Sequence, residues 1–144
     1  MVQPVSFRKA DTVAQLASLQ PEAIVVAAYG KILLPSVLAV PLRGCLNIHP
    51  SLLPKFRGSS PVAAAILYGL DVTGVSIFLL DEGVDSGPVL ARAQVAVLPS
   101  DTTGSLTEKL TLVGAQLLID VIPRWARGDI VPQPQDDSQA THTR

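Results

Sequence analysis

Hydrophobic residues recur along most of the chain at spacings that predict alternating helices and strands. Apolar positions at every third residue, beginning with Val13, predict a short helix that Asp11 caps and Pro21 stops. The apolar run over 23–28 is rich in β-branched residues and predicts a strand covered on both faces, which is typical of a parallel sheet. A weaker strand, broken by a proline, is predicted over 2–7.

The rest of the chain continues this alternation. Three further strands are predicted, at 44–48, 75–80 and 89–98. Short helices are predicted at 35–40 and from Ser60, where a serine cap precedes a proline at the first helical position. A stripe of Leu and Val at helical spacing predicts a long helix, which starts at a capping box formed by Ser105 and Glu108 and ends at Pro123.

The order of these elements predicts an α/β fold, with a mostly parallel sheet flanked by helices and room for an antiparallel edge pair. One helix and one weak strand stand where a parallel sheet normally opens with a βαβ unit. We therefore expect the chain to be the later part of a longer domain. From residue 132 the sequence turns polar, which predicts a surface segment or a linker over 132–144.

Composition and charge exclude several functions. The chain has 11 basic and 12 acidic side chains, and this balance argues against a broad, non-specific nucleic-acid surface. Aromatic residues make up only 4%, so extensive base stacking is not expected. A single cysteine excludes an intrachain disulfide and a Cys-rich zinc site, and it fits a reducing compartment. No apolar run approaches the roughly 18 residues of a membrane-spanning helix, and no signal-peptide pattern opens the chain.

The run LNIHPSLLPKFRG, residues 46–58, carries the first candidate chemistry. Asn47 and His49 stand two residues apart at the end of a strand, so their side chains project to the same side. In open α/β sheets ligands bind at this edge. An amide donor can hold a carbonyl or oxyanion, and a histidine can donate or transfer a proton near neutral pH. For either residue alone, a hydrogen bond within a turn is the commoner role.

The loop LDEGVDSGP, residues 80–88, carries the second. Its glycines allow sharp turns and a close approach to a ligand. Three carboxylates, Asp81, Glu82 and Asp85, are candidate partners for His49. The alternative is an acidic surface turn. The residues alone thus indicate a site that polarises a carbonyl group, and they name no substrate.

The run LNIHPSLLPKFRGSSP resembles the signature of the formyltransferases that use 10-formyltetrahydrofolate, and LDEGVDSGP resembles the second motif of that family at a matching separation. The joint match is far more specific than a short glycine motif. It implies a Rossmann-like formyltransferase fold that lacks the opening βαβ unit. It also implies an N-terminally incomplete catalytic domain over 1–131, followed by a polar tail or the start of a linker to a further domain over 132–144.

The resemblance implies roles for three side chains. Asn47 would hold and polarise the formyl oxygen. His49 would donate a hydrogen bond or proton to that oxygen as a tetrahedral intermediate forms, and Asp85 would pair with His49 and relay protons through water. No metal is needed for this chemistry. The implied folate pocket consists of apolar side chains and loop backbone, at Ile32, Leu33, Ser51, Leu52, Leu53, Pro54, Asp81, Glu82, Gly83 and Val84. For its leucines and isoleucine, core packing is the alternative.

The stretch from Arg57 to Pro61 and the end of the chain are more similar to the family members that formylate methionyl-tRNA than to those that formylate glycinamide ribonucleotide. This implies formyl transfer to the α-amine of initiator methionyl-tRNA in the cytoplasm, with Lys55 and Arg57 as contacts for the acceptor end. Two alternatives stay open: a formyltransferase with another amine acceptor, either glycinamide ribonucleotide or an amino-sugar nucleotide, and a folate-binding fragment without turnover.

Overall fold

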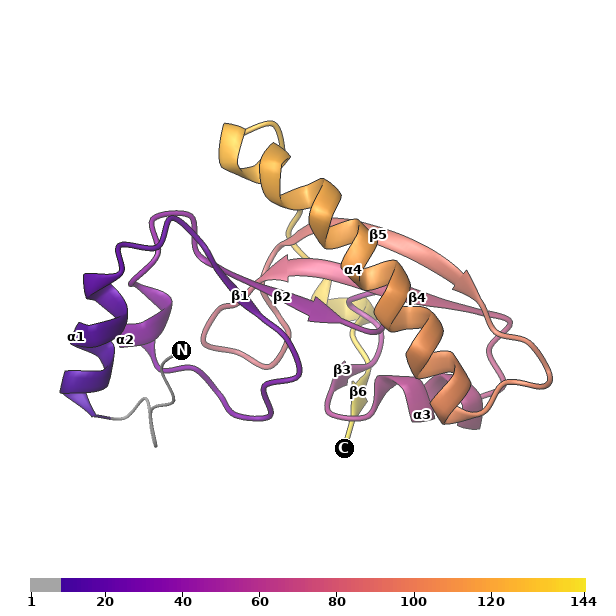
Figure 1. Cartoon of the computed structure of the whole chain (residues 1–144). Coiled ribbons are helices and arrows are strands. Elements are labelled where there is room, and N and C mark those ends of the chain that lie inside the picture. The colour runs from indigo at the N-terminus through magenta and orange to yellow at the C-terminus, as the bar shows by residue number, and fades with distance from the viewer. Residues whose placement is uncertain (1–8) are drawn as a thin grey trace.

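A computed structural model describes residues 9–144, and the strand expected over 2–7 lies outside them. The described part contains a four-stranded sheet, a two-stranded sheet and helices that lie on and beside them (Figure 1). In chain order the elements are α1 Ala10–Ser18, β1 Ile24–Val26, α2 Pro35–Leu38, β2 Cys45–His49, β3 Arg57–Gly58, α3 Pro61–Leu67, β4 Val72–Leu79, β5 Val89–Ala96, α4 Thr103–Arg127, the 3-10 helix η1 Asp137–Gln139 and β6 His142–Thr143.

The main sheet is mixed, so the expectation of a mostly parallel sheet was wrong. Its strand order is β1-β2-β4-β5, and only β1 and β2 run parallel. The pairs β2–β4 and β4–β5 are antiparallel. The physical reason is clearest for the last pair. A loop without a helix joins β4 to β5, and such a loop returns the chain antiparallel, whereas a parallel pair needs a crossover of about a dozen residues or more.

The strand that is covered on both faces is β4. Its residues 73–78 are all buried, with α4 over one face and the 51–54 loop over the other. In contrast, β1 lies at an edge of the described sheet, and Val25 is 42% exposed. The expectation that the 23–28 run is covered on both faces was therefore wrong, because the side of β1 that carries Val25 is exposed in the described part of the chain.

The first helix lies outside this core. It begins at Ala10, and Asp11 lies in its first turn instead of capping it. None of its residues is buried, although the sequence places apolar side chains along one side of it. Figure 1 shows α1 and α2 together at the β1 end of the sheet, away from α4.

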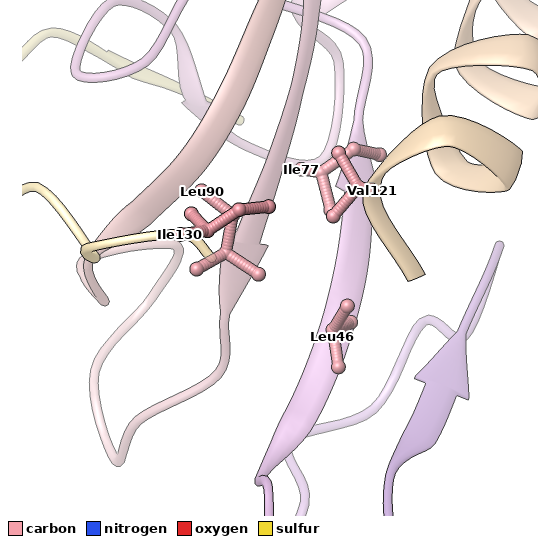
Figure 2. Packing of buried hydrophobic residues seen from close by; sticks show 5 residues of the cluster. All are labelled: Leu46, Ile77, Leu90, Val121 and Ile130. Atoms are coloured by element: carbon pink, nitrogen blue, oxygen red, sulfur yellow. The ribbon is translucent and has the colours of Figure 1, made fainter. Parts of the chain in front are cut away.

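The core behind β2 joins α4 to the main sheet. Figure 2 shows a cluster of five buried apolar side chains, Leu46, Ile77, Leu90, Val121 and Ile130. A second cluster joins α3 and α4 to the next part of β4, with Val62, Ala65, Val75, Leu106 and Leu110. Because Leu46 is fully buried directly before Asn47, this packing fixes the position of β2 and hence of the polar side chains at its end.

The long helix α4 begins three residues earlier than predicted. Thr102 is its N-cap, and the capping box pairs Thr102 with Ser105, so the expected pair of Ser105 and Glu108 was wrong. The Thr102 side chain accepts a hydrogen bond from the Ser105 backbone at 3.2 Å, and the Ser105 hydroxyl accepts one from the Thr102 backbone at 3.1 Å. Both threonine and serine can cap a helix, so the local pattern left the register open.

Asp101 strengthens this end of the helix. Its carboxylate accepts hydrogen bonds from Lys109 at 2.7 Å, from the Leu98 backbone and from the Ser105 hydroxyl. These contacts, led by the one from Lys109, lower the pKa of Asp101 to about 2. The side chain therefore stays ionised at neutral and mildly acidic pH.

The other end of α4 also departs from expectation. Pro123 lies inside the helix, which continues to Arg127 and ends at Gly128 in the left-handed conformation, with φ +80°. The ring of Pro123 is exposed, and so is Ile119 one turn earlier, so water can reach the carbonyl that the proline leaves without a donor. Trp125 fastens this end to the sheet by donating to the Arg43 carbonyl at 2.9 Å.

The polar segment 132–144 runs from the start of β5 to β3. Most of its side chains are exposed, as its composition predicts. Its backbone nevertheless pairs with the rest of the fold, because Gln133 exchanges two hydrogen bonds of 2.8 Å with Val89 at the start of β5. Further on, β6 pairs in parallel with β3, and Figure 1 shows the two strands side by side.

Candidate active site

Two polar residues of β2 line one pocket. Asn47 pairs with Phe78 of β4 and His49 pairs with Ser76, so their side chains leave β2 on the same side. Cys45, at the start of the strand, is buried, and burial raises the pKa of its thiol. A buried thiol of this kind is poorly reactive, so Asn47 and His49 are the residues of this strand that are candidates for chemistry in the pocket.

His49 is only 4% exposed and is held from two sides. Its Nε2 lies 2.8 Å from the Phe56 carbonyl, and its Nδ1 lies 3.6 Å from Oδ2 of Asp85. Because a carbonyl only accepts, Nε2 must carry the hydrogen that points to Phe56. Nδ1 can then donate toward Asp85 or a ligand only in the imidazolium form. The ring edge also meets the ring of Phe78 at a centroid distance of 6.3 Å.

Among the three candidate carboxylates of the 80–88 loop, Asp85 is the one that reaches His49. Its backbone has φ +51°, an uncommon conformation for a non-glycine residue, and its Oδ2 accepts a hydrogen bond from Gly58 N at 2.8 Å. Asp81 instead holds its own loop together through Gly83 N and the Ser86 hydroxyl. Glu82 is exposed and does not line the pocket.

The Asn47 amide is oriented by its own strand. Its Oδ1 accepts a hydrogen bond from Ile48 N at 2.9 Å, which fixes which end of the amide faces outward. Within the described part of the chain, Nδ2 has no protein partner and is the donor available to a ligand. Asn47 Nδ2 thus supplies a neutral donor to the cavity, and His49 Nδ1 supplies a cationic donor to the same cavity when the ring is in the imidazolium form.

This cavity has a volume of about 500 Å³, in the usual range for a small-molecule site. Four segments line it, at 26–33, 47–50, 58–61 and 80–85. Of the residues that the resemblance implied for folate, the structure brings five to the lining: Ile32, Leu33, Asp81, Gly83 and Val84. The backbone of Gly58 and Ser59 also contributes, and the sequence reasoning had not singled out either residue.

The other five implied folate positions, Glu82 and the four at 51–54, do not line the cavity. Ser51 and Leu53 are buried against β4. The Ser76 hydroxyl donates to the Ser51 carbonyl at 2.7 Å and accepts from Leu53 N at 3.0 Å. On the outer side, Arg92 donates to the Leu53 carbonyl at 2.8 Å, and partial burial lowers the pKa of Arg92. This turn packs within the fold and supports the loop that follows it.

Arg57, which the resemblance implied as a contact for the acceptor end, is buried and bound to other side chains of the fold. Its side chain is 6% exposed, and it donates to Gln135 and, at 2.7 Å, to Asp137. The hydrophobic pattern could not reveal this, because the partners of Arg57 are polar residues about 80 positions away. Lys55 is exposed and keeps its charge at the surface.

Residues of the C-terminal segment reach the site, and the sequence reasoning missed them. Gln135 donates to the carbonyls of Asp85 and Gly87, and Thr141 accepts from Phe56 N. Their only signal in the sequence is a run of polar side chains, which also fits an exposed tail. Across residues 9–144, no group of three or more His, Cys, Asp or Glu side chains is arranged to hold a metal ion. No helix in the same range has the length and apolar character needed to cross a membrane.

Known proteins are similar to this chain in sequence and in fold. A family model described as formyl transferase matches residues 1–122. Methionyl-tRNA formyltransferase of Chloroflexus aurantiacus is 55% identical over 144 residues, which are all of this chain and 46% of that protein. The chain thus spans about half the length of the curated relatives that it matches.

Solved structures of formyltransferases have a similar fold. Glycinamide ribonucleotide transformylase 1 of Symbiobacterium toebii has a TM-score of 0.82 and 26% identity, over 94% of this chain and 68% of that one. The formyltransferase PseJ of Anoxybacillus kamchatkensis, solved with a UDP-sugar and tetrahydrofolate, has a TM-score of 0.81 and 23% identity, over 98% of this chain and 70% of that one. The family model covers most of the sequence and these structures share its α/β fold, and we conclude that the chain belongs to the formyl transferase family.

Proposed function

We propose that this chain transfers a formyl group from 10-formyltetrahydrofolate to a primary amine, and that this amine is the α-amine of methionyl-tRNA. One observation carries the proposal: Asn47 Nδ2 and His49 Nδ1 are available in the same cavity, with Asp85 only 3.6 Å from the histidine nitrogen. Two hydrogen-bond donors held in place beside one carbonyl oxygen stabilise the negative charge that develops on this oxygen during the reaction.

The cavity suits a folate. Ile32 and Val84 line it and are 72% and 52% exposed, so they offer apolar surface that a flat ring system would cover. The backbone of the 81–84 loop stands beside them and offers hydrogen-bonding groups to the polar edge of such a ring. We assign the folate ring to this side of the cavity, with the formyl group directed toward Asn47 and His49.

The co-substrate supplies the formyl carbon and the nitrogen that leaves it. Asn47 Nδ2 and the imidazolium Nδ1 of His49 donate to the formyl oxygen while the amine forms its bond to the formyl carbon. Asp85 stabilises the imidazolium, and the Phe56 carbonyl fixes the ring from the other side. The 3.6 Å gap between Nδ1 and Oδ2 exceeds a normal hydrogen bond, so a water can join the pair. Through it Asp85 accepts the proton that the amine loses. The same proton then passes to the departing folate nitrogen as the bond between that nitrogen and the formyl carbon breaks.

The choice of acceptor rests on similarity to relatives. The 55% identity with a methionyl-tRNA formyltransferase extends over the whole chain, so it includes the loop around Lys55. Lys55 follows the catalytic strand and is exposed, which suits a contact with the phosphates of an acceptor end.

The test is formyl transfer by the complete open reading frame that encodes this chain, with methionyl-tRNA and glycinamide ribonucleotide offered in competition. Formylated methionyl-tRNA as the only product is the expected result. Product on the ribonucleotide would show that the assignment of methionyl-tRNA as the acceptor is wrong, and it would agree with the similarity to the Symbiobacterium transformylase. The proposed roles of Asn47, His49 and Asp85 would be unaffected. Folate binding without product on either acceptor would overturn the proposed catalysis.

A further inference from the structure

Two residues that hold His49 share an unusual backbone conformation. Phe56, which accepts from Nε2, has φ +56°, and Asp85, which faces Nδ1, has φ +51°. Neither is glycine, so both lie in a region that L side chains seldom occupy. Such conformations persist only where surrounding contacts over-determine them. The question is which contacts hold Phe56 and Asp85 in place.

The C-terminal segment 133–143 holds both of them, and we name it the brace. On one side, Phe56 N donates to the Thr141 hydroxyl at 2.8 Å, and Arg57 N donates to the Thr141 carbonyl at 2.8 Å. On the other side, the Gln135 amide donates to the carbonyls of Asp85 at 2.9 Å and Gly87 at 2.7 Å. The brace therefore contacts both arms that fix the histidine ring.

Gln135 is the centre of the brace because its amide is fully used. Its Nε2 donates twice, to the two carbonyls of the 85–87 turn, and its Oε1 accepts twice from Arg57, at 3.1 and 2.9 Å. An amide has two donor hydrogens and two acceptor lone pairs, so no capacity is left over. The opposite orientation would turn its oxygen toward two carbonyls and its hydrogens toward a guanidinium.

We propose that Gln135 is a positioning residue for the Asp85–His49 pair. By joining the carbonyls of Asp85 and Gly87, its amide fixes the turn and hence the place of Oδ2 relative to His49 Nδ1. Through Arg57 it also ties this turn to the strand that follows Phe56. The inference rests on the proposed function, in which that pair carries the proton.

The informative variant is Gln135→Glu in the complete open reading frame. It keeps oxygen acceptors for Arg57, and so keeps the anchor of the buried guanidinium, but it loses both N–H donors to the 85–87 turn. Gln135→Ala removes both halves. The matched control is Gln133→Ala, because the Gln133 side chain is exposed in the same segment and its pairing with Val89 uses only backbone atoms.

We expect kcat to fall about 10- to 100-fold in Gln135→Glu, since small displacements of a catalytic pair are costly. The KM for the folate co-substrate should stay within about threefold, as Gln135 does not line the cavity, and the Tm should stay near that of the control. An unchanged kcat overturns the proposal. Parallel losses of kcat, folate binding and Tm also overturn it, because they describe a merely structural residue.

A second readout separates this inference from the proposed function. In the complete open reading frame, the ring ¹⁵N signals of His49 are assigned as those lost in a His49→Ala variant, and the signals of His142 as those lost in a His142→Ala variant. Gln135→Glu should change the His49 ring signals and leave those of His142 unchanged, even if the protein transfers no formyl group. Should neither Gln135 variant fold, the wild-type Gln135 side-chain amide should exchange more slowly with water than that of Gln133. Equal exchange rates for the two side-chain amides would overturn the proposed role of Gln135 in the brace.

Discussion

Asp85→Asn tests the chemistry of the site with little change in shape. The two side chains have nearly the same size, and an amide oxygen can still accept from Gly58 N, as the Asp85 carboxylate does at 2.8 Å. What disappears is the negative charge 3.6 Å from His49 Nδ1. The substitution therefore asks how much that charge contributes to formyl transfer.

The magnitude follows from the distance and the burial. Two unit charges at this separation attract each other by about 4–5 kcal/mol at an effective dielectric constant of about 20. The side chains of His49 and Asp85 are only 5% and 15% exposed, so solvent weakens the attraction little. A change of about 1.36 kcal/mol in the barrier is tenfold in rate. Because part of the attraction already exists before the reaction, we expect kcat to fall about 100- to 1000-fold.

The assay measures single-turnover formyl transfer by the complete open reading frame, together with folate affinity and Tm. The control is Asp71→Asn, which removes the same charge from an exposed turn before β4 and should leave the rate unchanged. Folate affinity should change little in either variant. A rate for Asp85→Asn within about threefold of wild type, with the fold intact, would refute the electrostatic role of the pair.

Three further predictions follow. His49→Ala should lower the transfer rate about 100- to 1000-fold, as removal of a single oxyanion donor does elsewhere, with a modest change in folate affinity by titration; near-normal turnover would remove His49 from the mechanism. Gly58→Ala should cost about 1–3 kcal/mol in chemical denaturation, because φ is +105° and a Cβ would collide with the Thr143 carbonyl; unchanged stability would show that β6 yields there. The pKa of Asp101 is about 2 in the folded state and 3.8 without these contacts, so its carboxylate stabilises the folded state through contacts led by Lys109. This contribution to the free energy of unfolding is complete above about pH 4 and is lost as the pH falls toward 2. The Tm difference between wild type and Asp101→Asn should shrink over that window, and a constant difference would contradict the assignment.

Much of the local structure could be predicted from the sequence, because it depends on neighbours along the chain. The alternation over 75–80 predicted a strand that the structure has as β4, and Ser60 with Pro61 predicted the start of α3. The two-residue spacing of Asn47 and His49 predicted that their side chains share one side of a strand, and both line the cavity. Helix ends were less determined. Thr102 and Ser105 are both good capping residues, and in the folded chain Thr102 is the N-cap and Ser105 its partner in the capping box.

What the sequence by itself determined was the four strands of the main sheet, the helices α1 to α4 and the polar side chains at the end of β2, since periodicity and spacing act over a few residues. The short elements β3, β6 and η1 were not predicted. What only the tertiary structure decided was the direction of the strands, the burial of Arg57 and the place of the C-terminal segment. Strand direction depends on how a connection packs, and the 80–88 loop turns back without a helix. Arg57 and Gln135 meet across 78 residues through polar atoms, and hydrogen bonds of this kind leave no periodic trace in a chain. The proposed catalytic pair, His49 and Asp85, therefore belongs to two short sequence motifs, whereas the contacts that hold it in place exist only once the chain has folded.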